Sequence, residues 1–291
     1  MKFYSPLRYP GGKSKIAPVI SDMISNSNLD HCTYIEPFAG GSGVALMLLL
    51  EECVESIVIN DYDVAVYSFW RALKCETKEL IRLVNVTPVT IDEWHRQRNI
   101  YRNSHKYSLE LAFATLYLNR TNRSGILTGG PIGGYSQDGI WKLDARYDRQ
   151  KIVERILAIA NRKASIIVYN KDIISLIDNY IPRYMENAFI YFDPPYFNKG
   201  QKLYKNFFSS DDHRRIAERI RESIRCPWVI TYDDIPEIRA LYSDYDIRRF
   251  DLTYSAANKG TASEIMICSD PKMHLFQHAK SAVSTHLNFR T

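Results

Sequence analysis

The feature that most constrains the fold is a series of short apolar runs separated by helix-like stretches. These runs are rich in β-branched and aromatic residues, as strands are. They cover residues 33–38, 56–60, 165–169, 188–192, 228–232, 247–254 and 263–268. Strands of this kind that alternate with helices are typical of a parallel sheet covered on both faces. The sequence therefore predicts an α/β fold with a mostly parallel sheet.

The end of the chain departs from this pattern. The last two runs are joined only by residues 255–262, which include Asn258, Lys259 and Gly260. A connection this short suits a hairpin, so we expect an antiparallel strand near the C-terminus. Residues 271–291 carry little pattern and are expected to form a loosely ordered tail.

A long insertion separates the second and third runs. Residues 62–163 hold helical patterns, for example at 109–118, and residues 125–139 contain six of the 13 glycines. This composition predicts a mainly helical inserted domain with a glycine-rich loop. The sheet domain would then consist of residues 1–61 and 164–270.

The totals limit the class of protein. The 291 residues, of which 45% are hydrophobic, suffice for one large domain with an insertion. No apolar stretch approaches the roughly 18 residues of a membrane span, and the basic N-terminus lacks a secretory pattern. The five cysteines and seven histidines are scattered, which predicts a cytoplasmic protein without a metal site. The formal net charge of +5 is compatible with a polyanionic partner.

The first motif is Glu-Pro-Phe-Ala-Gly-Gly-Ser-Gly at residues 36–43, between the first predicted strand and a helical run. Glycines at such a turn let a ligand approach the backbone closely. The second predicted strand ends at Asp61, whose carboxylate could accept hydrogen bonds from ribose hydroxyls. These residues predict a nucleotide-like cofactor but leave a dinucleotide and S-adenosylmethionine both open.

A nearby Gly-Gly-Lys-Ser sequence does not predict ATP or GTP binding. A phosphate-binding loop needs a glycine five residues before Gly12, and that position holds Leu7. No strand pattern precedes the segment. We therefore interpret residues 10–14 as a turn.

The second motif is Asp193-Pro194-Pro195-Tyr196, which follows the predicted strand at 188–192. Ligands bind beyond the carboxyl ends of strands in open α/β sheets. An exocyclic amino group is a poor nucleophile, and a carboxylate together with a rigid proline carbonyl can accept its two hydrogens. That arrangement would direct the nitrogen lone pair at a methyl donor, and Tyr196 could stack on an extruded base. A simple proline turn is the alternative.

Together these residues resemble the Dam-type family of adenine DNA methyltransferases, over residues 7 to about 268. The resemblance implies a Rossmann-like methyltransferase sheet and S-adenosylmethionine as cofactor. Asp193, Pro194, Pro195 and Tyr196 would be catalytic. By the same resemblance the cofactor would contact Tyr9, Lys13, Phe38, Gly40, Asp61, Asp172 and Asp193.

The order of the motifs matches the family, with the cofactor motif first, the insertion next and the catalytic motif last. The insertion would be the target-recognition domain. Residues 118–120 and Gly125 resemble its opening stretch, but residues 121–124 replace an aromatic-Asn-Gly run of the best-known members. The recognition sequence therefore stays open, as do the oligomeric state and a role in restriction-modification, phage defence or solitary methylation.

The insertion also carries basic and aromatic residues that suit a nucleic acid. Arginine and lysine can neutralise phosphates, and arginine can read guanine edges. An exposed helical face is the alternative for each residue taken singly. The residues predicted to contact double-stranded DNA are Arg96, Arg98, Arg120, Asn122, Arg123, Tyr135 and Lys199.

The sequence thus predicts a site-specific methyltransferase that modifies the N6 amino group of a flipped adenine. Two alternatives remain. The same fold could act on the amino group of cytosine or on RNA, since that chemistry needs the same Asp193 geometry. A cofactor-dependent DNA-binding protein without turnover is the alternative of another class.

Overall fold

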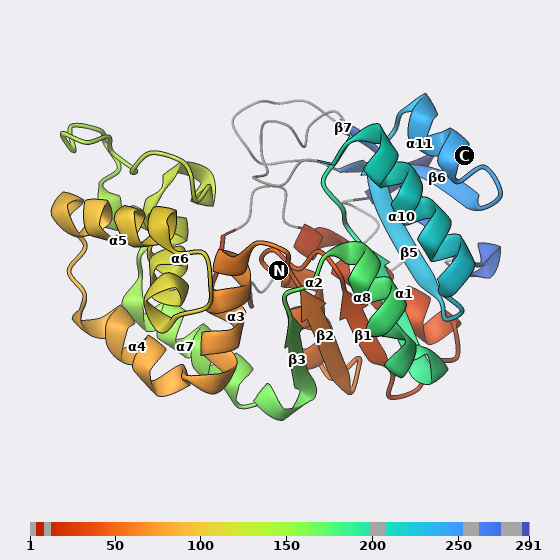
Figure 1. Cartoon of the computed structure of the whole chain (residues 1–291), viewed down its shortest axis with the longest axis horizontal. Helices are drawn as coiled ribbons and strands as arrows, with labels where there is room; N and C mark the ends of the chain where they lie inside the picture. Colours follow the sequence, from red (N-terminus) through yellow and green to blue (C-terminus); the bar gives the residue numbers. More distant parts are fainter. Residues whose placement is uncertain (1–3, 9–12, 198–207, 253–261, 275–286, 291) are drawn as a thin grey trace.

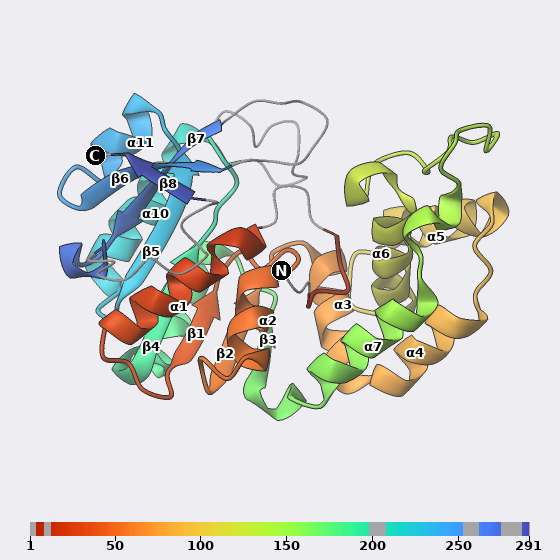
Figure 2. The ribbon, with the colours of Figure 1, turned by 180° about the vertical axis from the view of Figure 1, so that it is seen from behind.

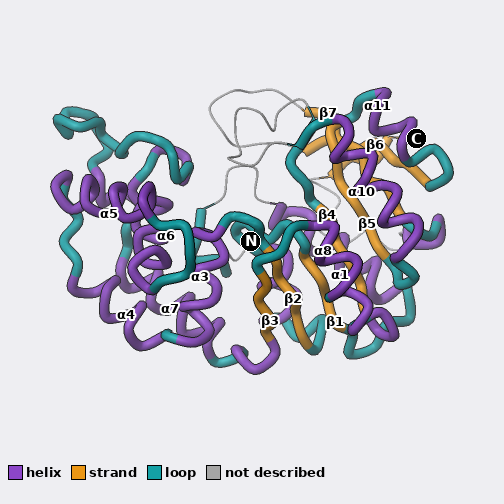
Figure 3. The backbone as a smooth tube through the Cα atoms, in the orientation of Figure 1, coloured by secondary structure: helices purple, strands orange, loops and turns teal. Residues whose placement is uncertain are grey.

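The computed structural model describes residues 4–8, 13–197, 208–252, 262–274 and 287–290. A twisted sheet with helices on both faces forms one part of the molecule, and a helical lobe lies beside it (Figure 1). The same two parts are visible from behind (Figure 2) and in the tube coloured by secondary structure (Figure 3).

The sheet has eight strands in the order β3-β2-β1-β4-β5-β7-β6-β8. The strands are β1 (Thr33–Glu36), β2 (Ser56–Asn60), β3 (Ile166–Tyr169), β4 (Ala188–Phe192), β5 (Trp228–Asp233), β6 (Asp246–Leu252), β7 (Ala262–Cys268) and β8 (Leu287–Arg290). The pairs from β3 to β5 are parallel, whereas β7 is antiparallel to both β5 and β6. The predicted mostly parallel sheet and its antiparallel C-terminal strand are confirmed.

Two layers of helices cover the sheet. On one face pack α1 (Ala17–Asn26) and α2 (Gly43–Leu50); on the other pack α8 (Ile173–Asn179), α10 (Ser210–Ser223) and α11 (Pro236–Leu241). Successive side chains of β4 alternate between these two layers, with Tyr191 in the first and Ile190 in the second. All five β4 residues are therefore buried, which explains their continuous apolar run.

The helical lobe contains α3 (Val64–Cys75), α4 (Thr77–Val86), α5 (Ile91–Asn103), α6 (Leu109–Thr121) and α7 (Arg149–Ala160). Helix α6 lies at its centre, and its residues 111–121 are all buried. The apolar core is continuous from Leu46 of α2 to Leu116 of α6. The sheet and the lobe therefore share one core, and the division into separate domains at residues 61 and 164 stays a prediction.

The C-terminal tail is more regular than the sequence suggests. Residues Pro271–His274 form a 3-10 helix, and β8 pairs with β6 at the edge of the sheet. The expectation of a loosely ordered tail is wrong for these residues. Pairing with the edge strand β6 supplies the backbone hydrogen bonds that the local sequence pattern does not reveal.

The N-terminal segment, residues 4–8, crosses to the lobe and is fixed on α6 (Figure 2). The amide of Asn119 accepts from the backbone N–H of Arg8 (2.6 Å) and donates to the carbonyls of Arg8 (2.7 Å) and Gly125 (2.9 Å). Gly125 has a φ of +76°, and a Cβ there would lie 2.4 Å from the Arg8 carbonyl oxygen. Asn119 and Gly125 together hold this segment against the lobe.

Two negative findings apply to the described residues. No helix among them combines the length and the apolar character that a membrane span requires. No group of three or more His, Cys, Asp or Glu side chains in the same part of the chain is placed to hold a metal ion.

We expect Asn119→Ala to lower the free energy of unfolding by about 3 kcal/mol, because it leaves three buried backbone groups without partners. Urea denaturation followed by circular dichroism measures this loss. Asn103→Ala, at an exposed position of α5, is the control, since among the described residues its amide bonds only to Asn99, and it should change stability by less than about 0.5 kcal/mol. Equal losses in the two variants would contradict the assignment.

Candidate active site

The predicted motifs meet at one edge of the sheet. The turn at 37–42 follows β1, Asp61 follows β2 and Asp193 follows β4. Because β2, β1 and β4 are adjacent and parallel, their carboxyl ends lie at the same edge. This is the edge at which open α/β sheets bind their ligands.

Two residues with positive φ shape the turn after β1. Gly40 has a φ of 45° and Ser42 a φ of 47°. The indole Nε1 of Trp70 on α3 donates to the Gly40 carbonyl at 2.9 Å, and the Ala39 N–H donates to the Asn60 carbonyl at 2.9 Å. The turn is thereby fixed both to the neighbouring strand β2 and to the lobe.

Glu36 supports this turn from within the core. Its side chain is buried, and Oε2 accepts from the backbone N–H of Ala45 in the first turn of α2 at 3.2 Å. Burial raises the pKa of Glu36 well above its usual range. The first residue of the Glu-Pro-Phe motif therefore positions the turn.

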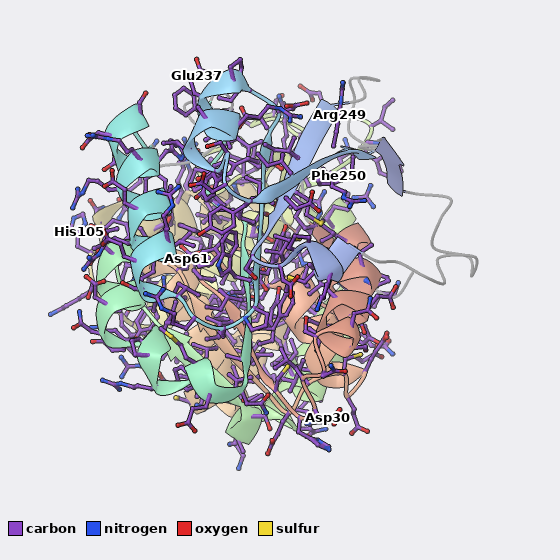
Figure 4. All side chains as sticks on the ribbon, turned by 90° about the vertical axis from the view of Figure 1, so that its right-hand side faces the viewer. Asp30, Asp61, His105, Glu237, Arg249 and Phe250 are labelled. Atoms are coloured by element: carbon purple, nitrogen blue, oxygen red, sulfur yellow. The ribbon has the colours of Figure 1, made fainter. Side chains whose placement is uncertain are left out.

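Asp61 closes the turn from the side of β2. Its Oδ2 accepts from the Gly40 N–H at 2.8 Å and its Oδ1 from the Asp63 N–H at 2.9 Å. Burial, aided by the neighbouring charge of Asp63, raises the pKa of Asp61 to about 7. Figure 4 shows Asp61 in the middle of the molecule, whereas labelled residues such as Asp30 lie at its periphery.

Asn60 is a site residue that the sequence reasoning missed. Its buried amide donates to the carbonyls of Pro37 (3.0 Å) and Lys171 (3.1 Å) and accepts from the Lys171 N–H (2.9 Å). It thus joins the loops after β1 and β3. A polar residue that ends a buried apolar strand was the available signal.

Asp172 lies in the loop after β3, beside the Lys171 that Asn60 holds. Its carboxylate is exposed and accepts from the Ser175 N–H at 3.0 Å, as the N-cap of α8. Helix capping therefore accounts for this residue type. Its contact with a cofactor stays a prediction.

Asp193 is held at the end of β4 by a chain of hydroxyl groups. Thr231 on β5 donates to Oδ1 of Asp193 at 3.0 Å, and the Tyr191 hydroxyl lies 2.9 Å from Thr231 Oγ1. The side chain of Asp193 keeps 24% of its surface exposed. Burial nevertheless raises its pKa, although the ammonium of Lys13 opposes the shift.

Lys13 joins the catalytic motif in the structure. Its Nζ lies 3.8 Å from Oδ1 of Asp193 and 2.5 Å from Oε2 of Glu264, and it donates a hydrogen bond to the Tyr196 hydroxyl. Glu264, on antiparallel strand β7, is completely buried. The sequence reasoning missed Glu264, whose signal was a single charge within an apolar strand.

Aromatic rings lie beside the catalytic motif. Phe38 contacts Phe208 edge to face with centroids 6.0 Å apart, and Phe197 lies 5.2 Å from His213. Nδ1 of His213 is 3.0 Å from the Tyr232 hydroxyl, and burial lowers the pKa of this imidazole. The Phe197 N–H donates to Asp233 at 3.2 Å. These contacts fix the chain on both sides of the segment 198–207.

Two predicted DNA contacts are wrong as direct contacts. Asn122 is completely buried, where it accepts from Trp94 Nε1 at 2.7 Å and donates to the Ile126 carbonyl at 2.8 Å. Arg120 is 8% exposed and donates through Nε to the Pro6 carbonyl at 2.7 Å. Asn122 holds the lobe together and Arg120 holds the N-terminal segment on it, because the backbone carbonyls there need these donors.

The other predicted DNA contacts that are described lie nearer the surface. Arg98 donates to the Tyr135 hydroxyl at 3.0 Å, and Tyr135 is 56% exposed. Arg123 is exposed, and the side chain of Arg96 is 72% exposed. Tyr9 and Lys199 fall outside the described residues.

Residues 9–256 match the D12 class N6 adenine-specific DNA methyltransferase family. The chain belongs to this family. The prediction of a DNA methyltransferase with adenine as its target is thereby confirmed, rather than one acting on cytosine or RNA. The motif at residues 36–43 and the predicted catalytic motif at residues 193–196 both fall inside the matched region.

Two curated relatives support this assignment to the D12 family. Type II methyltransferase M.MjaIII of Methanocaldococcus jannaschii is 24% identical over 74% of this chain and 78% of its own length. Type II methyltransferase M1.LlaDCHI of Lactococcus lactis subsp. cremoris is 23% identical over 89% of this chain and 93% of its own.

Among solved structures, the rRNA methyltransferase AviRa from Streptomyces viridochromogenes is 12% identical to this D12 family member. It covers 89% of this chain and 86% of its own, with a TM-score of 0.40. A TM-score this low carries no argument about the activity of the present chain.

The raised pKa of Asp61 predicts a pH dependence of cofactor binding. The ribose hydroxyls predicted to bind Asp61 would donate to the ionised carboxylate, whose fraction rises from about 10% at pH 6 to about 90% at pH 8 for a pKa near 7. The dissociation constant of S-adenosylmethionine should therefore fall, by up to about tenfold, as pH rises through 7. Calorimetric titrations at pH 6, 7 and 8 test this.

Asp63→Asn is the matched control for the Asp61 titration. Asparagine can still cap α3, as Asp63 does through the Ala65 N–H. Removing this neighbouring negative charge should move the transition to lower pH. Asp61→Asn should abolish the transition, and a wild-type affinity that does not vary between pH 6 and 8 would contradict the role of Asp61.

Proposed function

We propose that the protein transfers a methyl group from S-adenosylmethionine to N6 of an adenine flipped out of double-stranded DNA, with Asp193 and Pro194 as the groups that grip the amino nitrogen. The observation that carries this proposal is the position of Asp193. It lies at the end of β4, directly beside the strand whose following turn holds Phe38 and Gly40. An amine at Asp193 and a donor at that turn would be neighbours.

The hydrogen bonds of Asp193 orient its carboxylate for this task. Among the described residues, Thr231 and Lys13 both approach Oδ1. Oδ2 is therefore the oxygen that we assign to one amino hydrogen of adenine, and the Pro194 carbonyl takes the other. With both hydrogens bound, the nitrogen lone pair points out of the base plane, and no reorganisation is needed at the moment of reaction.

The cofactor, when bound, supplies an electrophilic methyl on a sulfonium cation. As the carbon–nitrogen bond forms and the sulfur–carbon bond breaks, the amino nitrogen becomes positive and must lose a proton. Asp193 is the acceptor that we assign, since burial raises its pKa and makes it a better base than an exposed aspartate.

The chemistry of the surrounding groups fits S-adenosylmethionine. Asp61, Asp63 and Asp193 place negative charge at the same sheet edge, which favours a cationic cofactor. We assign the ribose hydroxyls to Asp61 and the contact with the Gly40 turn to the adenosine part. Phe38 offers an apolar surface beside them.

The lobe provides the DNA-facing groups. Arg98, Arg123 and Tyr135 lie on the part of the lobe that bears the loop 126–142, on the same side of the molecule as the carboxyl ends of the strands (Figure 1). A duplex that spans this lobe and the sheet edge would bring a flipped base to Tyr196. We therefore propose residues 62–163 as the target-recognition domain and the cytoplasm, with DNA, as the site of action.

We expect Asp193→Ala to lower methyl transfer at least about 100-fold, because it removes a group that acts on the reacting nitrogen. Incorporation of label from S-adenosylmethionine into duplex DNA, followed by nucleoside analysis, measures the rate and should give N6-methyladenine. Affinities for DNA and cofactor should stay within about twofold of wild type.

Asp244→Ala removes an exposed carboxylate and should leave the rate unchanged. Undiminished transfer in Asp193→Ala would refute the catalytic assignment. A wild-type protein that binds both ligands without transfer would instead indicate a non-catalytic DNA-binding protein.

A further inference from the structure

Four arginines gather where the N-terminal segment meets the lobe. Arg8 belongs to that segment, Arg120 to α6, Arg146 to a 3-10 helix (Leu143–Arg146) and Arg155 to α7. We call these four residues the arginine cluster. They come from four separate parts of the chain, so the tertiary structure alone brings them together.

The hydrogen bonds of the arginine cluster go to neutral groups. Arg120 donates to the carbonyls of Pro6 (2.7 Å) and Arg146 (3.5 Å), and Arg155 donates to the Ser5 carbonyl at 3.0 Å. These contacts fix the N-terminal segment. None of these carbonyl acceptors carries a charge.

The pKa values reflect burial first and the neighbouring positive charges second. Burial and then the charges of Arg155 and Arg8 lower the pKa of Arg120 to about 10, and burial and Arg146 lower the pKa of Arg8. Among the described residues, the carboxylate that opposes the shift at Arg120 is Asp148. That side chain is exposed and pairs with Lys151 at 2.9 Å.

The clearest sign of a missing acceptor is at Arg8. Its Nη1 is buried and has no hydrogen-bond partner among the described residues. A buried guanidinium nitrogen without an acceptor costs free energy and is rare in native structures. An anion beside Arg8 would satisfy it.

We propose that the arginine cluster binds a phosphate group of the DNA backbone, with Arg8 and Arg146 as the two residues that contact it. The planar fork of a guanidinium matches the oxygens of a phosphate, and several arginines around one anion remove their mutual repulsion. This inference rests on the proposed function, because it takes duplex DNA as the source of the phosphate.

The position of the cluster agrees with such a contact. Arg8 is five positions before Lys13, whose ammonium contacts Tyr196 and Asp193. Five residues span at most about 17 Å, which corresponds to about five base pairs of duplex DNA. The proposed phosphate contact and the residue that contacts Asp193 and Tyr196 are therefore close along the chain.

The cluster also continues into the exposed loop of the lobe. The guanidinium of Arg146 lies 5.9 Å from the ring centroid of Trp141, which is 67% exposed, and the neighbouring Ile140 is 94% exposed. A duplex held at Arg146 would meet this loop as well. The N-terminal segment would then link the phosphate contact, the lobe and the catalytic motif.

The test compares Arg8→Gln and Arg146→Gln with Arg82→Gln, a matched loss of an exposed charge on α4. Fluorescence anisotropy at several salt concentrations gives the slope of log affinity against log salt for duplexes of two unrelated sequences. Each cluster variant should reduce this slope by up to about 0.9, the value for one phosphate, and weaken both duplexes by the same factor. Arg82→Gln should match wild type.

Thermal unfolding with and without inorganic phosphate separates DNA from a free anion as the ligand. Arg146 is exposed, so its variant keeps the fold even if Arg8→Gln is destabilised. Slopes equal to wild type in both cluster variants would overturn the proposal. So would stabilisation by inorganic phosphate that depends on Arg8 while the DNA slopes stay unchanged, since the site would then serve a free anion.

The outcome is independent of the proposed catalysis. A wild-type protein that transfers no methyl group, yet binds duplex DNA with an Arg8-dependent salt slope, would reject the proposed function and support the phosphate site. Normal methyl transfer by the wild-type protein, with salt slopes unaltered in the cluster variants, would support the proposed function and reject the phosphate site.

Discussion

The ion cluster around Lys13 is the interaction on which the rest of the site depends. A buried ammonium is costly unless it is paired, and this one is paired with Glu264 on β7 and lies near Asp193 beyond β4. Its hydrogen bond to Tyr196 brings the catalytic motif into the same group. Contacts from Lys13 and from the antiparallel end of the sheet therefore both help to position Asp193.

Hydrogen bonds between side chains and backbone groups hold the loops of the predicted cofactor site in place. Asn60 ties the loops after β1 and β3, and Asp61 ties the Gly40 turn to the start of α3. The side chains at the end of β2 thus shape the loops before any ligand arrives. The pKa of Asp61 is raised to about 7. The same carboxylate that orders the loop would therefore make cofactor binding sensitive to pH.

The N-terminal part of the chain contacts both the lobe and the predicted catalytic motif. Asn119 fixes the backbone of Arg8 on α6, and Lys13 donates hydrogen bonds to Tyr196 and Glu264. The arginine cluster lies at the first of these two points. A phosphate bound there would contact Arg8, five positions before the Lys13 that lies near Asp193. DNA binding and the alignment of the proposed catalytic groups would then depend on neighbouring parts of the chain.

The sequence by itself determined the sheet, its antiparallel end and the placement of Gly40, Asp61 and Asp193 at one edge, because strand patterns are local and the carboxyl ends of parallel strands meet at one edge. Its motifs also determined the family and adenine as the target. Only the tertiary structure decided that Asn122 and Arg120 are buried, that Glu264 pairs with Lys13, and that β8 extends the sheet. Charge pairing, burial and edge pairing depend on which distant segments meet, and a local pattern does not record that.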